Sequence, residues 1–177
     1  MLQQTAHLFG RRSWLLWLSV ALCVCLLQAC GFALRQPPSY AFTTLFSSVP
    51  ATTSLGGQLK RQLERDGRVE VITDVRQIER AQVIFDQLAE VREKVVVGRT
   101  GTGAIREFQL RLRYRFQVRN QAGVELIPET EILLSRDINF NETGALSKEY
   151  EEGLLYRDME QDVIAQIQRR LAALRRL

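Results

Sequence analysis

The chain has 177 residues, of which 25% are charged, with 24 basic residues, 20 acidic residues and a formal net charge of +4. Its single histidine, His7, and two of its three cysteines, Cys23 and Cys25, lie within the first 29 residues. Beyond Cys30 the sequence contains no histidine or cysteine, which excludes Ser-His and Cys-His nucleophiles, histidine acid-base catalysis and zinc sites built on these residues. We therefore predict that the chain is not an enzyme and holds no metal or cofactor.

The first residues have the layout of a bacterial signal peptide. Arg11 and Arg12 form a short positive patch, a mostly apolar run of 14 residues extends from Trp14 to Leu27, and the small residue Ala29 follows. The run is shorter than the roughly 20 residues that a helix needs to cross the hydrocarbon core of a membrane. A cleaved signal peptide over residues 1–29 is therefore favoured over a retained transmembrane helix.

The end of this segment, Leu27-Gln28-Ala29-Cys30, resembles the lipobox of bacterial lipoproteins. In such proteins the signal peptide is cut directly before a cysteine that carries acyl chains, such as palmitate, and several chains together give stable membrane attachment. The alternative is an ordinary signal peptide with a coincidental cysteine, but only Cys30 follows a small residue at the end of the apolar run. Gly31 stands where Asp commonly signals inner-membrane retention, which predicts the outer membrane.

Cleavage would leave residues 30–177 with 22 basic and 20 acidic residues and a net charge of +2, because the removed segment holds two arginines and no acid. A chain of this length suits one domain that buries about two-thirds of its unfolded surface. We predict a lipidated tether over residues 30–39, which include Pro37 and Pro38, and a single domain over residues 40–177.

The first part of this domain predicts a strand, a helix and a second strand. Tyr40–Val49 is rich in aromatic and β-branched residues and precedes a proline, as expected for a strand. Thr53 or Ser54 can cap a helix that stops at Gly67, and Arg68–Thr73 is predicted to be the next strand. The apolar residues of the helix repeat every four positions: Leu55, Leu59 and Leu63.

Two long strands and a shorter one follow. Gln82–Val97 is extended, and in Glu107–Arg119 apolar and polar residues alternate strictly, which predicts one buried face and one solvated, basic face. Gly98, Gly101 and Gly103 lie between them and predict a hairpin with a mobile tip. After a turn, Glu131–Phe140 is predicted to be the last strand.

From Lys148 to Arg176 the period becomes helical. One apolar stripe is formed by Leu155, Met159, Val163, Ile167, Leu171 and Leu174. The predicted fold is α+β, a two-layer sandwich in which two helices pack on one face of a four- or five-stranded, mostly antiparallel sheet. The order of the strands in the sheet is left open.

The glycine-rich segment from Gly98 to Gly103 invites comparison with a phosphate-binding loop. It lacks a Gly-Lys-Ser/Thr motif, and a strand rather than a helix follows it, so a hairpin tip is the favoured interpretation. The arginines that alternate along Glu107–Arg119 have two interpretations. They form either a solvated face balanced by acids such as Glu90 and Glu93, or a surface for a phosphorylated lipid or glycan, since an exported chain rarely meets nucleic acid.

Three segments of the chain are similar to the LptE family of outer-membrane LPS-assembly lipoproteins. They are Cys30-Gly31-Phe32-Ala33-Leu34-Arg35 after the lipobox, Ser135-Arg136 with Phe140, and Ala145-Leu146-Ser147-Lys148-Glu149 before the last helix. The resemblance covers residues 26–177. It implies a two-helix, four-stranded sandwich that plugs the LPS-exporting β-barrel LptD, assists the folding of that barrel and binds LPS.

The resemblance also implies which residues contact LPS. The basic residues that match the family's positions at the hairpin tip and before the last helix are Arg99 and Lys148, whose charges suit lipid A phosphates. Arg106 and Arg111 are added as neighbouring candidates. Two other functions stay open, namely a lipoprotein that carries lipid or lipoprotein in an apolar cavity, and a periplasmic hydrolase that uses carboxylates only.

Overall fold

The computed structural model describes residues 38–140 and 145–175, which belong to one compact unit, Pro37–Leu177. The predicted signal peptide, Cys30 and most of the predicted tether lie outside the described residues. Within these ranges, no helix is long and apolar enough to span a membrane.

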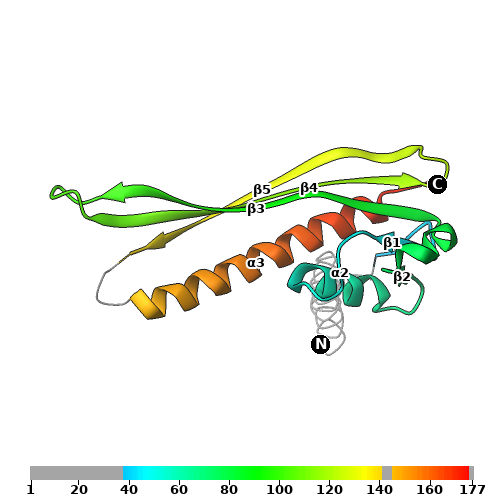
Figure 1. The fold of residues 1–177 in the computed structure, drawn as a ribbon, viewed down its shortest axis with the longest axis horizontal. Helices are drawn as coiled ribbons and strands as arrows, with labels where there is room; N and C mark the ends of the chain where they lie inside the picture. The colour runs from blue at the N-terminus through cyan, green and yellow to red at the C-terminus, as the bar shows by residue number, and fades with distance from the viewer. Residues whose placement is uncertain (1–37, 141–144, 176–177) are drawn as a thin grey trace, which may run out of the picture. The chain divides into compact units, whose positions relative to one another are not determined.

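The centre of the unit is a five-stranded mixed sheet (Figure 1). Its strands are β1 (Thr44–Ser47), β2 (Glu70–Ile72), β3 (Val83–Arg99), β4 (Ile105–Asn120) and β5 (Glu125–Asn139). They lie in the order β2-β1-β3-β4-β5. Strand β1 pairs in parallel with β2 and β3, whereas the β3-β4-β5 meander is antiparallel.

The two α-helices of the described residues pack on one side of this sheet, which confirms the predicted sandwich (Figure 1). Helix α2 (Ser54–Glu64) begins where the side-chain oxygen of Thr53 accepts a hydrogen bond from the Gly56 nitrogen at 3.0 Å. Gly56 is required there for space, since a Cβ would lie 2.2 Å from the carbonyl oxygen of Pro50. The predicted leucines Leu55, Leu59 and Leu63 are all buried.

Helix α3 (Ala145–Ala172) supplies the largest part of the helical layer. The predicted stripe lies against the sheet, with Met159, Val163, Ile167 and Leu171 each 0% exposed. Opposite them lie the alternate residues of β4, which are also 0% exposed: Leu110, Leu112, Tyr114, Phe116 and Val118. We call the side of the sheet that carries these residues the helix-covered face, and the other side the open face.

Strands β1 and β5 differ most from their predicted boundaries. Strand β1 is four residues long, because β2 pairs only with Thr44 to Phe46 and β3 only with Leu45 to Ser47. Strand β5 begins at Glu125, six residues earlier than predicted, and includes Pro128. A proline is compatible with this strand because β5 is at the edge of the sheet, where one row of backbone groups needs no partner strand.

A 3-10 helix that the sequence did not predict, η1 (Val75–Arg80), begins after Asp74, whose side chain accepts a hydrogen bond from the Arg76 nitrogen. A small second apolar cluster contains side chains from β1, β2, the end of η1 and β3, with Ile78 packed against it. Its buried members are Phe46, Ile72, Ala81 and Ile84.

Candidate functional site

The β3-β4 hairpin ends in a short, hydrogen-bonded turn. The Thr100 nitrogen donates to the Ala104 carbonyl oxygen at 2.8 Å, and the Gly103 nitrogen donates to the Thr100 carbonyl oxygen at 2.9 Å. Gly103 has a φ of +89°, which favours glycine. The tip that the sequence predicts to be mobile therefore has a defined turn in this structure.

Arg99 is the last residue of β3, directly before this turn. One of its guanidinium nitrogens donates to the Gly103 carbonyl oxygen at 3.0 Å, and the side chain is exposed. Arg99 has no acidic partner among residues 38–140 and 145–175. Its charge is therefore available to an anion, because a neutral carbonyl leaves most of the guanidinium donors unused.

The segment that carries Arg99 extends past the third strand. The last residue of β5, Asn139, pairs with Glu107 of β4, and the Phe140 nitrogen donates to the Arg106 carbonyl oxygen, so the hairpin from Gly98 to Ile105 consists of two strands only. We call this segment the overhang. Gly98 allows the strands to approach, since a Cβ there would lie 2.9 Å from the Cβ of Glu107.

Lys148 lies in the first turns of α3, at the same end of the unit as the overhang (Figure 1). We call this the distal end, and the end that holds β1, β2 and α2 the proximal end. The Lys148 ammonium nitrogen lies 2.7 Å from a carboxylate oxygen of Glu151, and its side chain is 26% exposed. Lys148 thus carries a paired charge, unlike Arg99.

Arg106 and Arg111 lie on opposite faces of the sheet. Arg106 accepts a backbone hydrogen bond from Phe140 and, by the alternation of β4, belongs to the helix-covered face with Phe108. Arg111 belongs to the open face, where its Nε donates to the Gln109 side chain at 2.8 Å. Arg99, Arg106 and Lys148 therefore gather at the distal end, and Arg111 does not share a surface with Arg106.

The arginines of β4 follow the open face in a row: Arg111, Arg113, Arg115 and Arg119. Arg115 pairs with Glu129 at 2.9 Å and Arg119 with Asp86 at 2.8 Å. Across the described part of the chain, Arg113 has no ion-pair partner. This row is thus partly balanced by acids.

The acids that we expected to balance this row are divided between the two faces. Glu93 lies opposite Arg111 on the open face, as expected, but Glu90 lies opposite Tyr114 on the helix-covered face. Glu90 pairs there with Arg92 at 2.7 Å. The expectation was wrong for Glu90 because a β-bulge between Gln87 and Ala89 inserts one extra residue in β3 and reverses the alternation.

A charged seam joins the distal half of β3 to α3. Arg92 contacts Glu160 at 2.6 Å, Lys94 contacts Glu152 at 2.7 Å, and the Tyr156 hydroxyl donates to the Glu93 carbonyl oxygen at 2.9 Å. Burial alone would lower the pKa of Arg92, but hydrogen bonds and charges from the acids around it raise that pKa overall. The guanidinium is thus held in its charged form.

The carboxylate of Glu160 is buried, with a side chain that is 1% exposed, and the Ser54 hydroxyl also donates to it at 2.6 Å. No pattern in the sequence predicted a role for Glu160. Its signal is that Glu160 lies four positions after Tyr156, on the buried side of α3. Because it contacts both α2 and β3, Glu160 connects three elements of the fold.

Arg136, which interrupts the apolar pattern of β5, connects that strand to α3. Its guanidinium lies 3.1 Å from Asp158 and 2.6 Å from Asp162. The hydrogen bonds that the guanidinium donates to these two carboxylates raise the pKa of Arg136. This residue of the family motif therefore positions α3 on the sheet.

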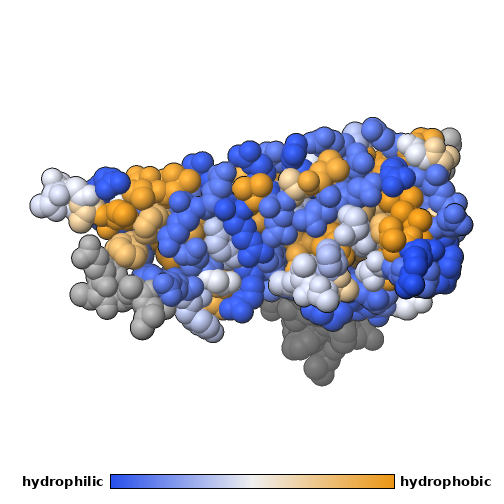
Figure 2. All heavy atoms as spheres, viewed as in Figure 1, coloured by the Kyte–Doolittle hydropathy of each residue, from blue (hydrophilic) through white to orange (hydrophobic). Residues whose placement is uncertain are grey.

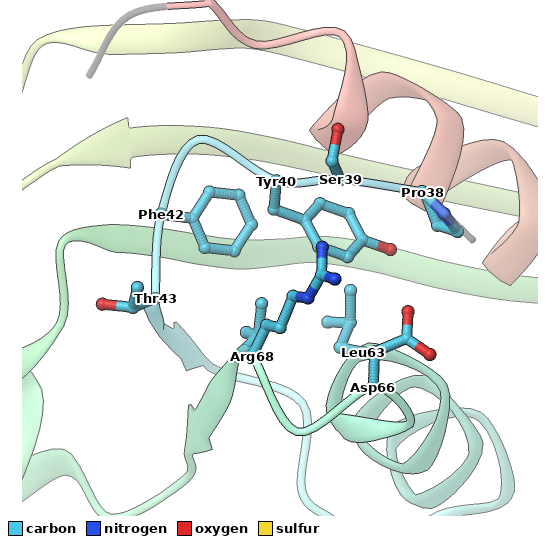
Figure 3. A pocket seen from close by; sticks show the side chains of 9 residues that line it. Pro38, Ser39, Tyr40, Phe42, Thr43, Leu63, Asp66 and Arg68 are labelled. Atoms are coloured by element: carbon cyan, nitrogen blue, oxygen red, sulfur yellow. The ribbon is translucent and has the colours of Figure 1, made fainter. Parts of the chain in front are cut away.

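A pocket of about 350 Å³ lies at the proximal end, beside the start of the described chain (Figure 3). Tyr40 and Phe42, whose ring centroids are 5.3 Å apart, line it with Leu63, and Asp66 and Arg68 add charged groups. In the described ranges, no group of three or more His, Cys, Asp or Glu residues is arranged to hold a metal ion.

Comparison with known proteins gives a family and a set of solved structures. Residues 42–171 match the family LptE, described as lipopolysaccharide-assembly. An NMR structure of an uncharacterized lipoprotein B from Nitrosomonas europaea is similar, with 30% identity, a TM-score of 0.67 and coverage of 81% of this chain and 91% of that one. No curated protein sequence matches the chain.

Two crystal structures share the fold at lower identity. A minor lipoprotein from Acinetobacter baumannii is 21% identical, with a TM-score of 0.58 and coverage of 76% of this chain and 94% of that one. The rare lipoprotein B from Shewanella oneidensis is 22% identical, with a TM-score of 0.59 and coverage of 74% and 93%.

Proposed function

This chain belongs to the LptE family of lipopolysaccharide-assembly lipoproteins, and from that premise we propose that it is a non-enzymatic component of LPS assembly at the outer membrane. Acyl chains on Cys30 hold it to the periplasmic side of that membrane after residues 1–29 are removed. It forms a complex with the β-barrel LptD as plug and assembly factor, and it binds LPS. The domain that performs these tasks is residues 40–177.

The observation that carries the LPS-binding part is the position of Arg99. It is an exposed guanidinium on a hairpin tip, and among the residues that the structure describes it bonds only to a neutral carbonyl oxygen. Guanidinium groups form paired, charge-assisted hydrogen bonds with phosphate oxygens. Lys148 lies at the same end and can exchange Glu151 for a phosphate, since an exposed ion pair is weak.

Co-purification tests the complex. The full-length lipoprotein is extracted from membranes in mild detergent and isolated by affinity purification. A stoichiometric large β-barrel protein is the expected partner. A monomer that co-purifies with acyl chains and without a barrel would contradict the proposal and support the lipid-carrier function.

Charge reversal tests the LPS site. Arg99→Glu with Lys148→Glu should weaken LPS binding by roughly tenfold or more, because two attractive contacts to phosphate become repulsive. The matched control reverses two exposed arginines outside the site, Arg61→Glu with Arg157→Glu. Equal LPS affinity of both folded variants would refute the assignment of Arg99 and Lys148.

The lipid-carrier function receives less support, because the space between α3 and the sheet is filled by side chains. Tyr114, Phe116, Met159, Ile164 and Ile167 are all 0% exposed. Interiors packed in this way leave no room for an acyl chain. A lipid that binds this unit at α3 and the sheet must therefore lie on its surface.

A further inference from the structure

The first turns of α3 contribute no buried side chain to the core. Within residues 147–152 every side chain is exposed or only half-buried, whereas from Tyr156 onwards the helix presents a buried stripe to the sheet. Figure 2 shows mainly hydrophilic residues at this start of the helix, below the hairpin. We call residues 147–152 the leading segment and residues 156–171 the body of α3.

Gly153 separates the leading segment from the body. It lies in the interior of a 28-residue helix and is exposed. Among the described residues, a Cβ at this position would meet nothing within 4 Å, so close packing does not require a glycine here. A glycine inside a helix makes the helical state about fivefold less favourable than an alanine does. The helix is therefore weakened just before its buried stripe begins.

The body is anchored to the sheet immediately after Gly153. Tyr156 is 8% exposed, and its hydroxyl donates to the Glu93 carbonyl oxygen at 2.9 Å. The Arg92 guanidinium carbon lies 5.4 Å from the centroid of the Tyr156 ring, and Arg92 also contacts Glu160 at 2.6 Å. The first turn of the body is thus held by burial, a hydrogen bond and an ion pair.

The leading segment is joined to the sheet, within the described ranges, by one ion pair. The Lys94 ammonium nitrogen lies 2.7 Å from a carboxylate oxygen of Glu152, and the two side chains are 38% and 24% exposed. The same ammonium lies 4.5 Å from the centroid of the half-buried Phe108 ring. Lys94 therefore bridges the leading segment and the helix-covered face. Because a partly exposed ion pair is weak, this contact can break while the core stays packed.

We propose that the leading segment is a latched hinge segment, which opens as a unit about Gly153 and is closed by the ion pair between Lys94 and Glu152. So short a helix is not stable by itself in water, so the segment loses its helical order when the latch breaks. Opening releases Lys94 from the helix, and it changes the position of Lys148, which lies in the segment. This device goes beyond the proposed function and does not depend on what the lipoprotein binds.

Hydrogen exchange of backbone amides, followed by NMR on the full-length lipoprotein in mild detergent, tests the proposal. In an α-helix the amides of residues 149–155 donate to the carbonyl oxygens of residues 145–151, so they report the opening of the leading segment. They should share one opening constant, at least about tenfold larger than that of the amides of residues 159–167. Simple fraying of the helix end would instead give protection that rises gradually along the chain.

Replacing the glycine tests the hinge. Gly153→Ala should reduce the opening constant of residues 149–155 about fivefold, because alanine is the better helix former. The matched control, Gln161→Ala, changes an exposed position in the body and should leave the opening of the leading segment unchanged.

A double-mutant cycle tests the latch. Glu152→Gln should raise the opening constant of residues 149–155 by about two- to fivefold, because the ion pair is lost. Lys94→Gln should have the same effect. The double variant should open no more than either single variant, since both residues act through one contact. Circular dichroism checks that each variant folds.

Three results would overturn the inference. Protection that matches the body, or that rises gradually from residue 149, would mean that no separate segment opens. If Gly153→Ala slows exchange equally along all of α3, the helix opens as a whole. If the effects of Lys94→Gln and Glu152→Gln are absent or additive, the ion pair is not the latch. The proposed function is untouched by each of these results, because neither LPS nor a barrel is present in the experiment.

Discussion

The proximal and distal ends of the sandwich are built from different interactions. At the proximal end, each face of the sheet carries an apolar cluster. Leu45 and Phe46, which are neighbours in β1, therefore belong to separate clusters. At the distal end the sheet narrows to two strands, and the contact between β3 and α3 is made by Arg92 and Lys94 with acids of the helix.

This difference implies that the two ends contribute unequally to the stability of the fold. Burial of apolar surface is the dominant favourable term in folding, and exposed ion pairs contribute little. The proximal half should therefore supply most of the free energy of folding. The distal end can then carry the unpaired Arg99 and the exposed Val97 at small cost to stability.

The largest expected effect comes from the packed part of the core. Phe116→Ala should lower the free energy of unfolding by about 3–5 kcal/mol, because the ring is 0% exposed and stacks on Phe85 with centroids 5.3 Å apart. Urea unfolding measures the loss. The half-buried Phe108 provides the comparison, since Phe108→Ala should lose less than half as much. Equal losses would contradict the contrast between the two ends.

Glu160 lies where the two regions meet, and its replacement should have the next largest effect. Glu160→Gln should destabilise the fold by roughly 1–3 kcal/mol, because it removes the charge from hydrogen bonds with Ser54 and Arg92. Glu152→Gln, at the more exposed Lys94 pair, should cost at most about 1 kcal/mol. Thermal unfolding of both variants ranks the two sites. A larger loss at Glu152 would show that the distal pair is the stronger one.

Tyr114→Phe is expected to stabilise the protein by roughly 1 kcal/mol, because its buried hydroxyl has no hydrogen-bond partner among the described residues. Burial, and then the charge of Glu90, raise the pKa of Tyr114 far above its ordinary value of 10.0. Above about pH 10 the unfolded chain loses this proton while the folded chain keeps it, so stability falls as the pH rises.

The phenylalanine variant should lose less stability than the wild type between about pH 9 and pH 11, since it lacks this proton. Urea unfolding at both pH values gives the difference. The same pH dependence in both proteins would mean that Tyr114 ionises normally in the folded state.

The smallest effect is expected at the overhang. Arg99→Glu should change the free energy of unfolding by at most about 0.5 kcal/mol, as is usual for exposed residues without structural partners. Urea unfolding of this variant beside wild type checks the value. A loss above about 1 kcal/mol would show that Arg99, through its bond to the Gly103 carbonyl oxygen, stabilises the turn, and would weaken its assignment as a residue kept for LPS.

Local patterns predicted a large part of the fold. The alternation of Glu107–Arg119 marked β4 and its buried face, and the stripe from Leu155 to Leu174 marked α3, because residue periods of 2 and 3.6 follow from local backbone geometry. Motifs in the sequence also identified the family, and they placed the candidate residues Arg99 and Lys148 at a hairpin tip and at the start of a helix.

Other features depend on contacts between segments far apart in the sequence. The position of β1 between β2 and β3 is of this kind, and so are the partners of Glu160. The early start of β5, at Glu125, is a third example. The division of Glu90 and Glu93 between the two faces follows from one extra residue, Leu88, in the register between β3 and β4.

The sequence by itself therefore determined which segments form strands and helices and which family the chain resembles, since these depend on short-range spacing. Only the tertiary structure decided which charges share a face and which are paired. It brought Arg99, Arg106 and Lys148 to the distal end, separated Arg111 from them, and left Val97 exposed beside them. The reason is that strand register and strand ends are set by pairing between distant segments, and a single bulge reverses every face that follows it.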